Sequence, residues 1–198
     1  MNEVVPIITG NLRTKLMAKG YGEPLSVPFV IKPDCGFSQC WLNVQTMIQR
    51  EGGGLVIGRI IWQQESGLWL HLEAHAIWRT PDGRLVDPTP KVESETEVVF
   101  VEDDFKYVGE VMIPSKYIVM SKSPKVRRFV EVLEQRAAII NAILSGSRPN
   151  DVGTLEENKL RLAGELMQLA QELFPQDYVR MMRQAQSNTS VLMGHDTP

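Results

Sequence analysis

The chain has 198 residues, which is enough for one well-buried core or for a compact domain with a helical appendage. Its hydrophobic fraction is 43%, and no stretch approaches the ~20 apolar residues that a membrane span requires, so we expect a soluble protein with no membrane contact. A net charge of -3 provides no basic surface for nucleic acid, which makes nucleic acid an unlikely partner and favours small-molecule or protein substrates.

The first residues lack the basic region, long apolar stretch and cleavage site of a secretory signal, so the expected compartment is the cytoplasm. The only cysteines are Cys35 and Cys40, too few for a disulfide framework. A local disulfide between them is an alternative that a reducing compartment disfavours.

The first 36 residues are rich in Gly and Pro, and predict a short helix over residues 12–18 and a short strand over residues 27–31. A helix is expected from residue 39 or 40 to residue 50, with Ser38 as its cap, because Trp41, Val44 and Ile48 recur at helical spacing. The triplet at residues 52–54, Gly-Gly-Gly, ends this helix.

Three apolar runs follow, at residues 55–63, 68–80 and 84–87, with turn residues between them. They predict an antiparallel meander. Further strands are expected at residues 98–101, 107–113 and 117–120, which makes a sheet of five or six strands.

The pattern changes to a helical period near Ser123, which we expect to cap a helix that ends before Gly146. Residues 147–153 are predicted as a loop, and Thr154 with Glu157 forms a capping box for a second helix, which Pro175 ends. Residues 176–186 are expected to form a third helix.

The predicted fold class is therefore α+β, with a helix packed on an antiparallel sheet and a helical extension at the C-terminus. The expected organisation is a core at residues 1–122, a helical extension at residues 123–186 that packs on the core or binds a partner, and a disordered tail at residues 187–198.

Cys40 is placed where a thiol is most readily activated. A helix N-terminus together with an imidazole lowers a thiol pKa from about 8.5 into the range of roughly 3.5 to 7.5. Backbone N–H groups at the same helix start are able to receive an oxyanion, and Gln39 and Asn43 are candidate side-chain contributors. The competing interpretation is that Cys40 is a small buried hydrophobe.

His75 and Asp87 are the expected partners of this thiol. Period-two alternation places His71, Glu73 and His75 on one face of a strand, and three polar side chains there indicate a cleft. The tight turn at residues 82–83 brings Asp87 next to His75, where its carboxylate is expected to accept the Nδ1 proton. A structural histidine and a turn aspartate that caps Thr89 are the alternatives.

These motifs resemble the transglutaminase-like branch of the papain-type fold. The matching pieces are Cys40-Trp41, then His75-Ala76-Ile77-Trp78, then Asp87-Pro88-Thr89, and they span less than a third of the chain. The resemblance implies a papain-like core, a triad of Cys40, His75 and Asp87, no cofactor, and acyl transfer or hydrolysis at a peptide or protein amide. Trp78 and Glu73, beside the histidine, are weaker candidates for substrate contact.

Two other classes of function stay open. The first is a metal site built from Cys35, Cys40, His71, Glu73, His75 and Asp87, although the spacing matches no familiar zinc motif. The second is an inactive binding module whose C-terminal helices engage a protein partner. Three cations in a first helical turn, Lys125, Arg127 and Arg128, are unusual there and support it.

Overall fold

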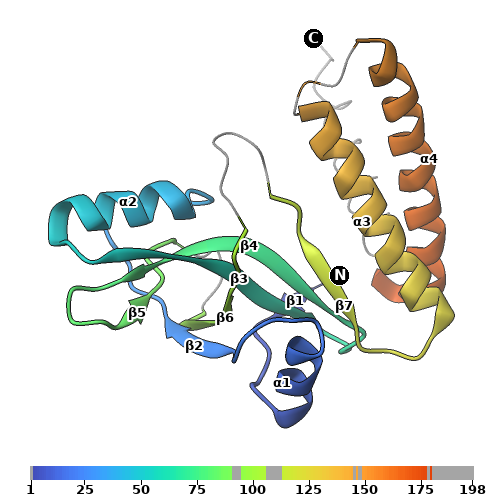
Figure 1. Cartoon of the computed structure of the whole chain (residues 1–198). Coiled ribbons are helices and arrows are strands. Elements are labelled where there is room, and N and C mark those ends of the chain that lie inside the picture. Colours follow the sequence, from blue (N-terminus) through green and yellow to red (C-terminus); the bar gives the residue numbers. More distant parts are fainter. Residues whose placement is uncertain are drawn as a thin grey trace, which may run out of the picture. The chain divides into compact units, whose positions relative to one another are not determined.

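The computed structural model describes residues 2–90, 95–105, 113–144, 146, 149–177 and 179. The chain divides into two compact units, Asn2–Ser121 and the residues from Lys122 onward. The first unit combines helices with an antiparallel sheet, and the second is helical, so the predicted α+β class is confirmed (Figure 1). The papain-like arrangement within that class stays a prediction.

The sheet is built around one long hairpin. Strands β3 and β4 pair from Gly54 opposite Arg79 to Gln63 opposite Leu70 without a break. The strand order is β2-β6-β3-β4-β5, with β1 beside β3 and β7 beside β4, and every pair of the described strands is antiparallel. The strand bounds are β1 Glu3–Val4, β2 Leu25–Pro28, β3 Gly54–Gln64, β4 Trp69–Arg79, β5 Leu85–Val86, β6 Glu97–Glu102 and β7 Lys116–Val119.

Apolar residues of the sheet form three buried clusters. One gathers around Leu70 and Leu72 of β4 and includes Leu12 and Leu16 of the short helix α1 (Gly10–Met17). Another contains Ile77 of β4 with Phe100 of β6. The sheet therefore supplies the core, and the helices complete it.

Helix α2 (Cys40–Glu51) packs across β4, as Figure 1 shows. Its buried Val44 and Met47 lie against Ala76, Trp78 and Val86, which form the third cluster. The predicted helix is confirmed at both ends.

The glycines after α2 make the turn into β3 possible. Gly52 and Gly53 have φ values of 78° and 89°, a region that favours glycine. A side chain at Gly53 would also collide with the carbonyl oxygen of Arg79. This close approach allows Trp78 Nε1 to donate a hydrogen bond of 3.0 Å to the carbonyl oxygen of Gly52.

Two predictions about the segment before α2 are wrong in detail. Ser38 is not the cap: its φ is 57°, and Gln39 is the N-cap residue, without a side-chain cap bond. The strand predicted at residues 27–31 lies at Leu25–Pro28 instead. It ends earlier because Phe29 leaves β6 and forms a parallel bridge to Asp87.

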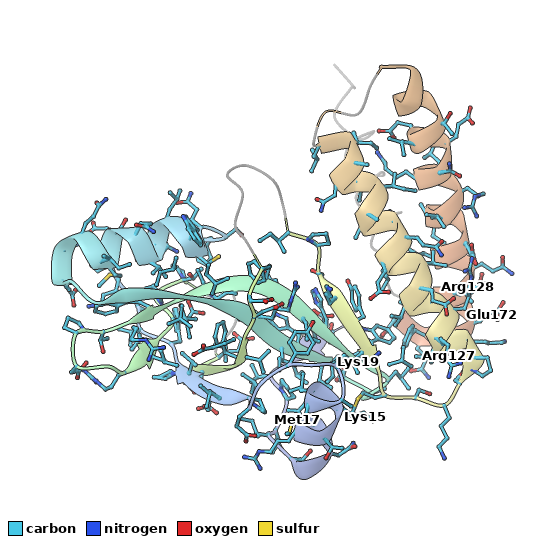
Figure 2. All side chains as sticks on the ribbon, viewed as in Figure 1. Lys15, Met17, Lys19, Arg127, Arg128 and Glu172 are labelled. Atoms are coloured by element: carbon cyan, nitrogen blue, oxygen red, sulfur yellow. The ribbon has the colours of Figure 1, made fainter. Side chains whose placement is uncertain are left out.

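The second unit contains an antiparallel pair of helices, α3 (Pro124–Leu144) and α4 (Pro149–Leu173). Lys125 pairs with Glu172 at 2.7 Å, and Arg128 pairs with Glu165 at 2.7 Å. Figure 2 accordingly labels Arg128 and Glu172 at the same end of the two helices. None of the helices in the described ranges is long and apolar enough to cross a membrane.

The start predicted for α4 is wrong, because the helix begins at Pro149 rather than after Gly153. Proline is well tolerated in a first helical turn, and an isolated helical glycine costs only about 1 kcal/mol, so neither stops the helix. At the other end α4 stops at Leu173, two residues before the predicted stop at Pro175.

Three predicted segments lie wholly or largely outside the described residues: the strand at residues 107–113, the third helix at residues 176–186 and the tail from residue 187. The strand predicted at residues 117–120 is present as β7.

Candidate active site

Cys40 is the first residue of α2 and is half-buried. Helix α2 starts there because Gln39 has left helical geometry while its carbonyl oxygen already accepts the first intrahelical bond, from the Asn43 N–H at 2.8 Å. The first N–H groups of a helix have no partner inside it, and they carry the positive end of the helix dipole. The thiol is therefore held where negative charge on sulfur is favoured.

His75 and Asp87 form a buried pair. The ring Nε2 of His75 lies 3.0 Å from Asp87 Oδ2, and the two residues are 6% and 0% exposed. The expectation that the carboxylate meets Nδ1 is wrong, since Asp87 follows β5 and reaches the far nitrogen of the ring. Nδ1 is the ring nitrogen that this bond does not use.

The Cys40 thiol and the His75 ring are close enough to shift each other's pKa. Burial alone would raise the pKa of the Cys40 thiol, but the hydrogen bond and the charge of His75, together with the backbone of Ala76, lower it below its usual value. Burial likewise opposes the charged ring, yet the charge and hydrogen bond of Asp87 raise the pKa of His75 to about 9. Both shifts favour a thiolate beside an imidazolium.

Hydrogen bonds hold both the side chain and the backbone of Asp87 in place. Its Oδ1 accepts a hydrogen bond of 2.9 Å from the Thr89 N–H, which is the turn-capping bond of the alternative interpretation. Its N–H donates to the Pro28 carbonyl, and its own carbonyl accepts from the Val30 N–H, both at 3.0 Å. One carboxylate thus caps the turn and orients the histidine at once.

Asn43 was expected to contact an oxyanion, but its side chain is engaged in hydrogen bonds within the protein. It is only 2% exposed, and its Oδ1 accepts from the Gly36 N–H while its Nδ2 donates to the Gly36 carbonyl, each at 2.8 Å. Nδ2 also lies 3.3 Å from Thr89 Oγ1. Asn43 therefore ties α2 to the segment before it and to the turn that holds Asp87.

The other three side chains named as substrate contacts are spread around the site. Gln39 is exposed at the N-cap, and its amide lies close over the backbone of Gly36. Trp78 is buried with α2 and bonded to Gly52. Glu73 is exposed and accepts a hydrogen bond of 3.0 Å from Trp62 Nε1. Of the three, only Gln39 combines exposure with a position beside Cys40.

His71 belongs to a separate cluster, so the polar face predicted for β4 does not form one cleft. Its Nδ1 lies 2.9 Å from Glu3 Oε2, its Nε2 lies 2.9 Å from Ser115 Oγ, and its ring stacks on Tyr117. Among the described residues, no group of three or more His, Cys, Asp or Glu side chains is arranged to hold a metal ion. The metal set inferred from the sequence is therefore not brought together, because His71 lies in this separate cluster and Glu73 pairs with Trp62.

Both cysteines are free thiols. Cys35 packs on the same cluster as Cys40, and burial raises the pKa of its thiol. The two thiols therefore shift in opposite directions: the pKa of Cys40 is lowered and the pKa of Cys35 is raised.

Sequence reasoning missed the hydrogen bonds that join Asn43 to Gly36 and to Thr89. The signal that points to them is Asn43, a polar residue on the helix face that otherwise carries Val44 and Met47. A buried amide needs partners for both its donor and its acceptor, so its position predicts neighbouring backbone groups.

Comparisons with protein-family models, with curated proteins and with solved structures each give no significant match. The geometry of the site is therefore the basis for assigning a function.

Proposed function

We infer that the protein is a thiol enzyme that cleaves or transfers the acyl group of an amide through a thioester on Cys40. The observation that carries this inference is the position of the Cys40 thiol, at the start of a helix and close to a His75 ring that Asp87 holds through a buried hydrogen bond of 3.0 Å. A nucleophile, a base and a group that orients the base are the three parts that nucleophilic catalysis requires.

In the first half of the reaction, the Cys40 thiolate attacks the amide carbonyl carbon and forms a carbon–sulfur bond. The oxyanion is stabilised by backbone N–H groups at the start of α2, with the side chain of Gln39 as a further donor. The protonated His75 ring gives its Nδ1 proton to the amide nitrogen, the carbon–nitrogen bond breaks, and an amine leaves.

In the second half, His75 removes a proton from water or from an acceptor amine, which attacks the thioester carbon. The carbon–sulfur bond breaks, and the acid or the new amide departs while the thiolate is restored. Asp87 keeps the ring oriented and stabilises its positive charge in both halves.

The reaction predicts that Cys40 is alkylated by iodoacetamide near neutral pH much faster than Cys35. The rates are measured by mass spectrometry of the intact protein and of its peptides. A slower reaction at Cys40 than at Cys35 would contradict the proposed nucleophile.

The reaction class itself is tested by following the release of amine from peptide amides with the purified protein. Cys40→Ser is the matched control, because it keeps the size of the side chain and removes the thiol. Release that Cys40→Ser does not diminish would reject the proposal.

A further inference from the structure

A closed ring of contacts passes through Cys40 and its neighbours. The thiol lies close enough to His75 for each to shift the pKa of the other, and His75 Nε2 is 3.0 Å from Asp87 Oδ2. The second oxygen of that carboxylate, Oδ1, accepts the Thr89 N–H at 2.9 Å. We call the complete set the site ring: Cys40, His75, Asp87, Thr89, Asn43, Gly36 and Gln39.

The site ring returns to the thiol along the start of α2. Asn43 Nδ2 lies 3.3 Å from Thr89 Oγ1, and the Asn43 amide bonds to the N–H and the carbonyl of Gly36, each at 2.8 Å. The side-chain amide of Gln39 lies over Gly36, and Gln39 directly precedes Cys40 in the chain. The thiol and the Gln39 amide are therefore connected to the two oxygens of one buried carboxylate.

The amide of Gln39 is the polar group of the site ring that stays available. Gln39 is exposed and makes no cap bond to α2, and its amide has no hydrogen bond to any other residue that the structure describes. A neutral amide beside a nucleophile is a suitable donor for a carbonyl oxygen that gains charge when the nucleophile adds to the carbon.

Gly36 determines where this amide is able to lie. A Cβ on Gly36 would be 2.9 Å from Gln39 Oε1 and 3.1 Å from Gln39 Cδ, which is too close for either atom to stay in place. The three heavy atoms nearest to that Cβ all belong to the Gln39 amide. Gly36 does not have a positive φ, so the space that it leaves, rather than its backbone conformation, requires a glycine.

We propose that Gly36 is a positioning residue of the candidate active site, because it leaves the space from which the Gln39 amide donates a hydrogen bond to the acyl oxygen. This inference rests on the proposed function for the identity of the acyl group, whereas the place of the amide is a property of the site ring. The acyl oxygen is uncharged before attack and negative after it, so the donor stabilises the tetrahedral state more than the bound substrate. Its effect therefore belongs to kcat.

The inference is tested with N-acetylglycinal, an aldehyde that adds reversibly to a thiolate. The Cys40 sulfur bonds to the aldehyde carbon, and the carbonyl electron pair moves to oxygen, which takes the proton of the His75 ring and accepts the hydrogen bond of the donor. The dissociation constant is measured from the protection of Cys40 against iodoacetamide, by mass spectrometry of the Cys40 peptide. Iodoacetamide loses iodide without adding to a carbonyl, so its rate without aldehyde measures the activation of the thiol alone.

Gln39→Ala should weaken aldehyde binding about fivefold, as expected for one net hydrogen bond. Gly36→Ala should weaken it about as much when Gln39 is present, and by less than about 1.5-fold in a protein that already carries Gln39→Ala, because Gly36 acts through the amide. The iodoacetamide rate and the free energy of unfolding of Gly36→Ala should equal those of wild type, since the displaced atoms end a flexible, exposed side chain.

Gly22→Ala is the matched control, because a Cβ on Gly22 meets nothing within 4 Å. This variant should bind the aldehyde as wild type does. An equal loss from Gly36→Ala with and without the Gln39 side chain would overturn the inference, since Gly36 would then act independently of the amide. Unchanged binding in Gln39→Ala, or wild-type binding no tighter than that of glutathione, would overturn it as well.

The aldehyde is bound whether or not amides are turned over, so the two proposals fail separately. A protein that binds the aldehyde as expected and releases no amine from peptide amides would reject the proposed reaction and support the donor. If amides are turned over, Gly36→Ala should lower kcat about fivefold at an unchanged KM. A change confined to KM would overturn the inference.

Discussion

Two histidines lie four residues apart on β4, and each bridges a carboxylate and a nucleophilic atom. His75 joins Asp87 to the Cys40 thiol, and His71 joins Glu3 to the Ser115 hydroxyl. Their surroundings differ: Asp87 is fully buried, whereas the Glu3 side chain is 35% exposed. Cys40 also starts a helix, whereas Ser115 directly precedes the strand β7.

The comparison shows why a carboxylate, a histidine and a nucleophilic side chain placed together are not sufficient for a reactive site. A charge pair in water is screened and contributes little, whereas a buried pair with satisfied hydrogen bonds holds its charge state. A helix start adds free N–H groups that a strand, whose N–H groups serve the sheet, does not have. We therefore propose a role in the reaction for His75 and structural support for His71.

The sharpest test of this difference is removal of the thiol. Cys40→Ala should lower turnover by about 10⁴-fold or more, because the residual rate no longer passes through a covalent intermediate. Ser115→Ala, the matching change in the other cluster, should lower turnover by less than about threefold. Both are read as amine release, with circular dichroism to confirm the fold.

If the Cys40→Ala variant still released amine, and the additional change Ser115→Ala abolished that release, the assignment of the two clusters would be reversed.

The next largest effect is expected for Asp87→Asn. The amide keeps the shape of the carboxylate but cannot stabilise the imidazolium, so turnover should fall by about 10³-fold, mainly in kcat. Glu3→Gln, the corresponding change at His71, should leave kcat unchanged. The test is to measure kcat of both variants by steady-state kinetics. Equal losses of kcat would mean that burial of the carboxylate does not distinguish the His75 site from the His71 site.

The pH dependence gives a third test. The Cys40 pKa is lowered and the His75 pKa is about 9, so the ion pair forms above the former and is lost as pH rises through the latter. Turnover should accordingly rise as pH passes the lowered pKa of Cys40 and fall above about pH 9. In His75→Gln, the alkylation of Cys40 should shift to higher pH, toward the usual thiol range near 8.5, since burial is then opposed only by the backbone of Ala76 and by the helix start.

The same shift implies a stability effect of known sign. The folded pKa of His75 is above its unfolded value of about 6.5. Its contribution to the free energy of unfolding is therefore fully present below about pH 6.5 and is lost as pH rises through about 9. Urea unfolding of wild type and His75→Gln across this range should show the difference shrinking with rising pH. A constant difference would argue against the ion pair.

A smaller effect is expected for Asn43, which supports the site without touching the thiol. Asn43→Ala removes the hydrogen-bond partner of the half-buried N–H and carbonyl groups of Gly36, which should cost about 1 kcal/mol of stability for each, and turnover should fall about 10-fold through kcat. Asn43→Asp keeps the acceptor for the Gly36 N–H and loses the donor, so its alkylation profile at Cys40 should lie between wild type and Asn43→Ala. Equal profiles in all three would restrict Asn43 to stability.

The smallest effect belongs to His71→Ala. Loss of the stack on Tyr117 and of two partly exposed hydrogen bonds should cost about 1 to 2 kcal/mol of stability. Turnover should stay within about threefold of wild type. Thermal unfolding and amine release measure the two quantities, and a large loss of turnover with an unchanged melting temperature would show that His71 acts in the reaction.

Local patterns were sufficient for the elements that carry the site. Helical spacing of Val44 with its neighbours, and the glycines at residues 52–54, predicted α2 from end to end. Alternation in residues 69–79, followed by the turn at residues 82–83, predicted β4 and placed Asp87 beside His75. These signals work because each depends on residues that are neighbours along the chain.

Contacts between distant segments decided the rest. Which ring nitrogen meets Asp87, which partners Asn43 finds, and why β2 ends at Pro28 all depend on segments that are separated in sequence and adjacent in space. Period-two alternation likewise predicted one polar face for His71, Glu73 and His75. Burial then placed His75 with the thiol, because its neighbours are contributed by α2 and by the turn after β5, which the pattern of a single strand does not contain.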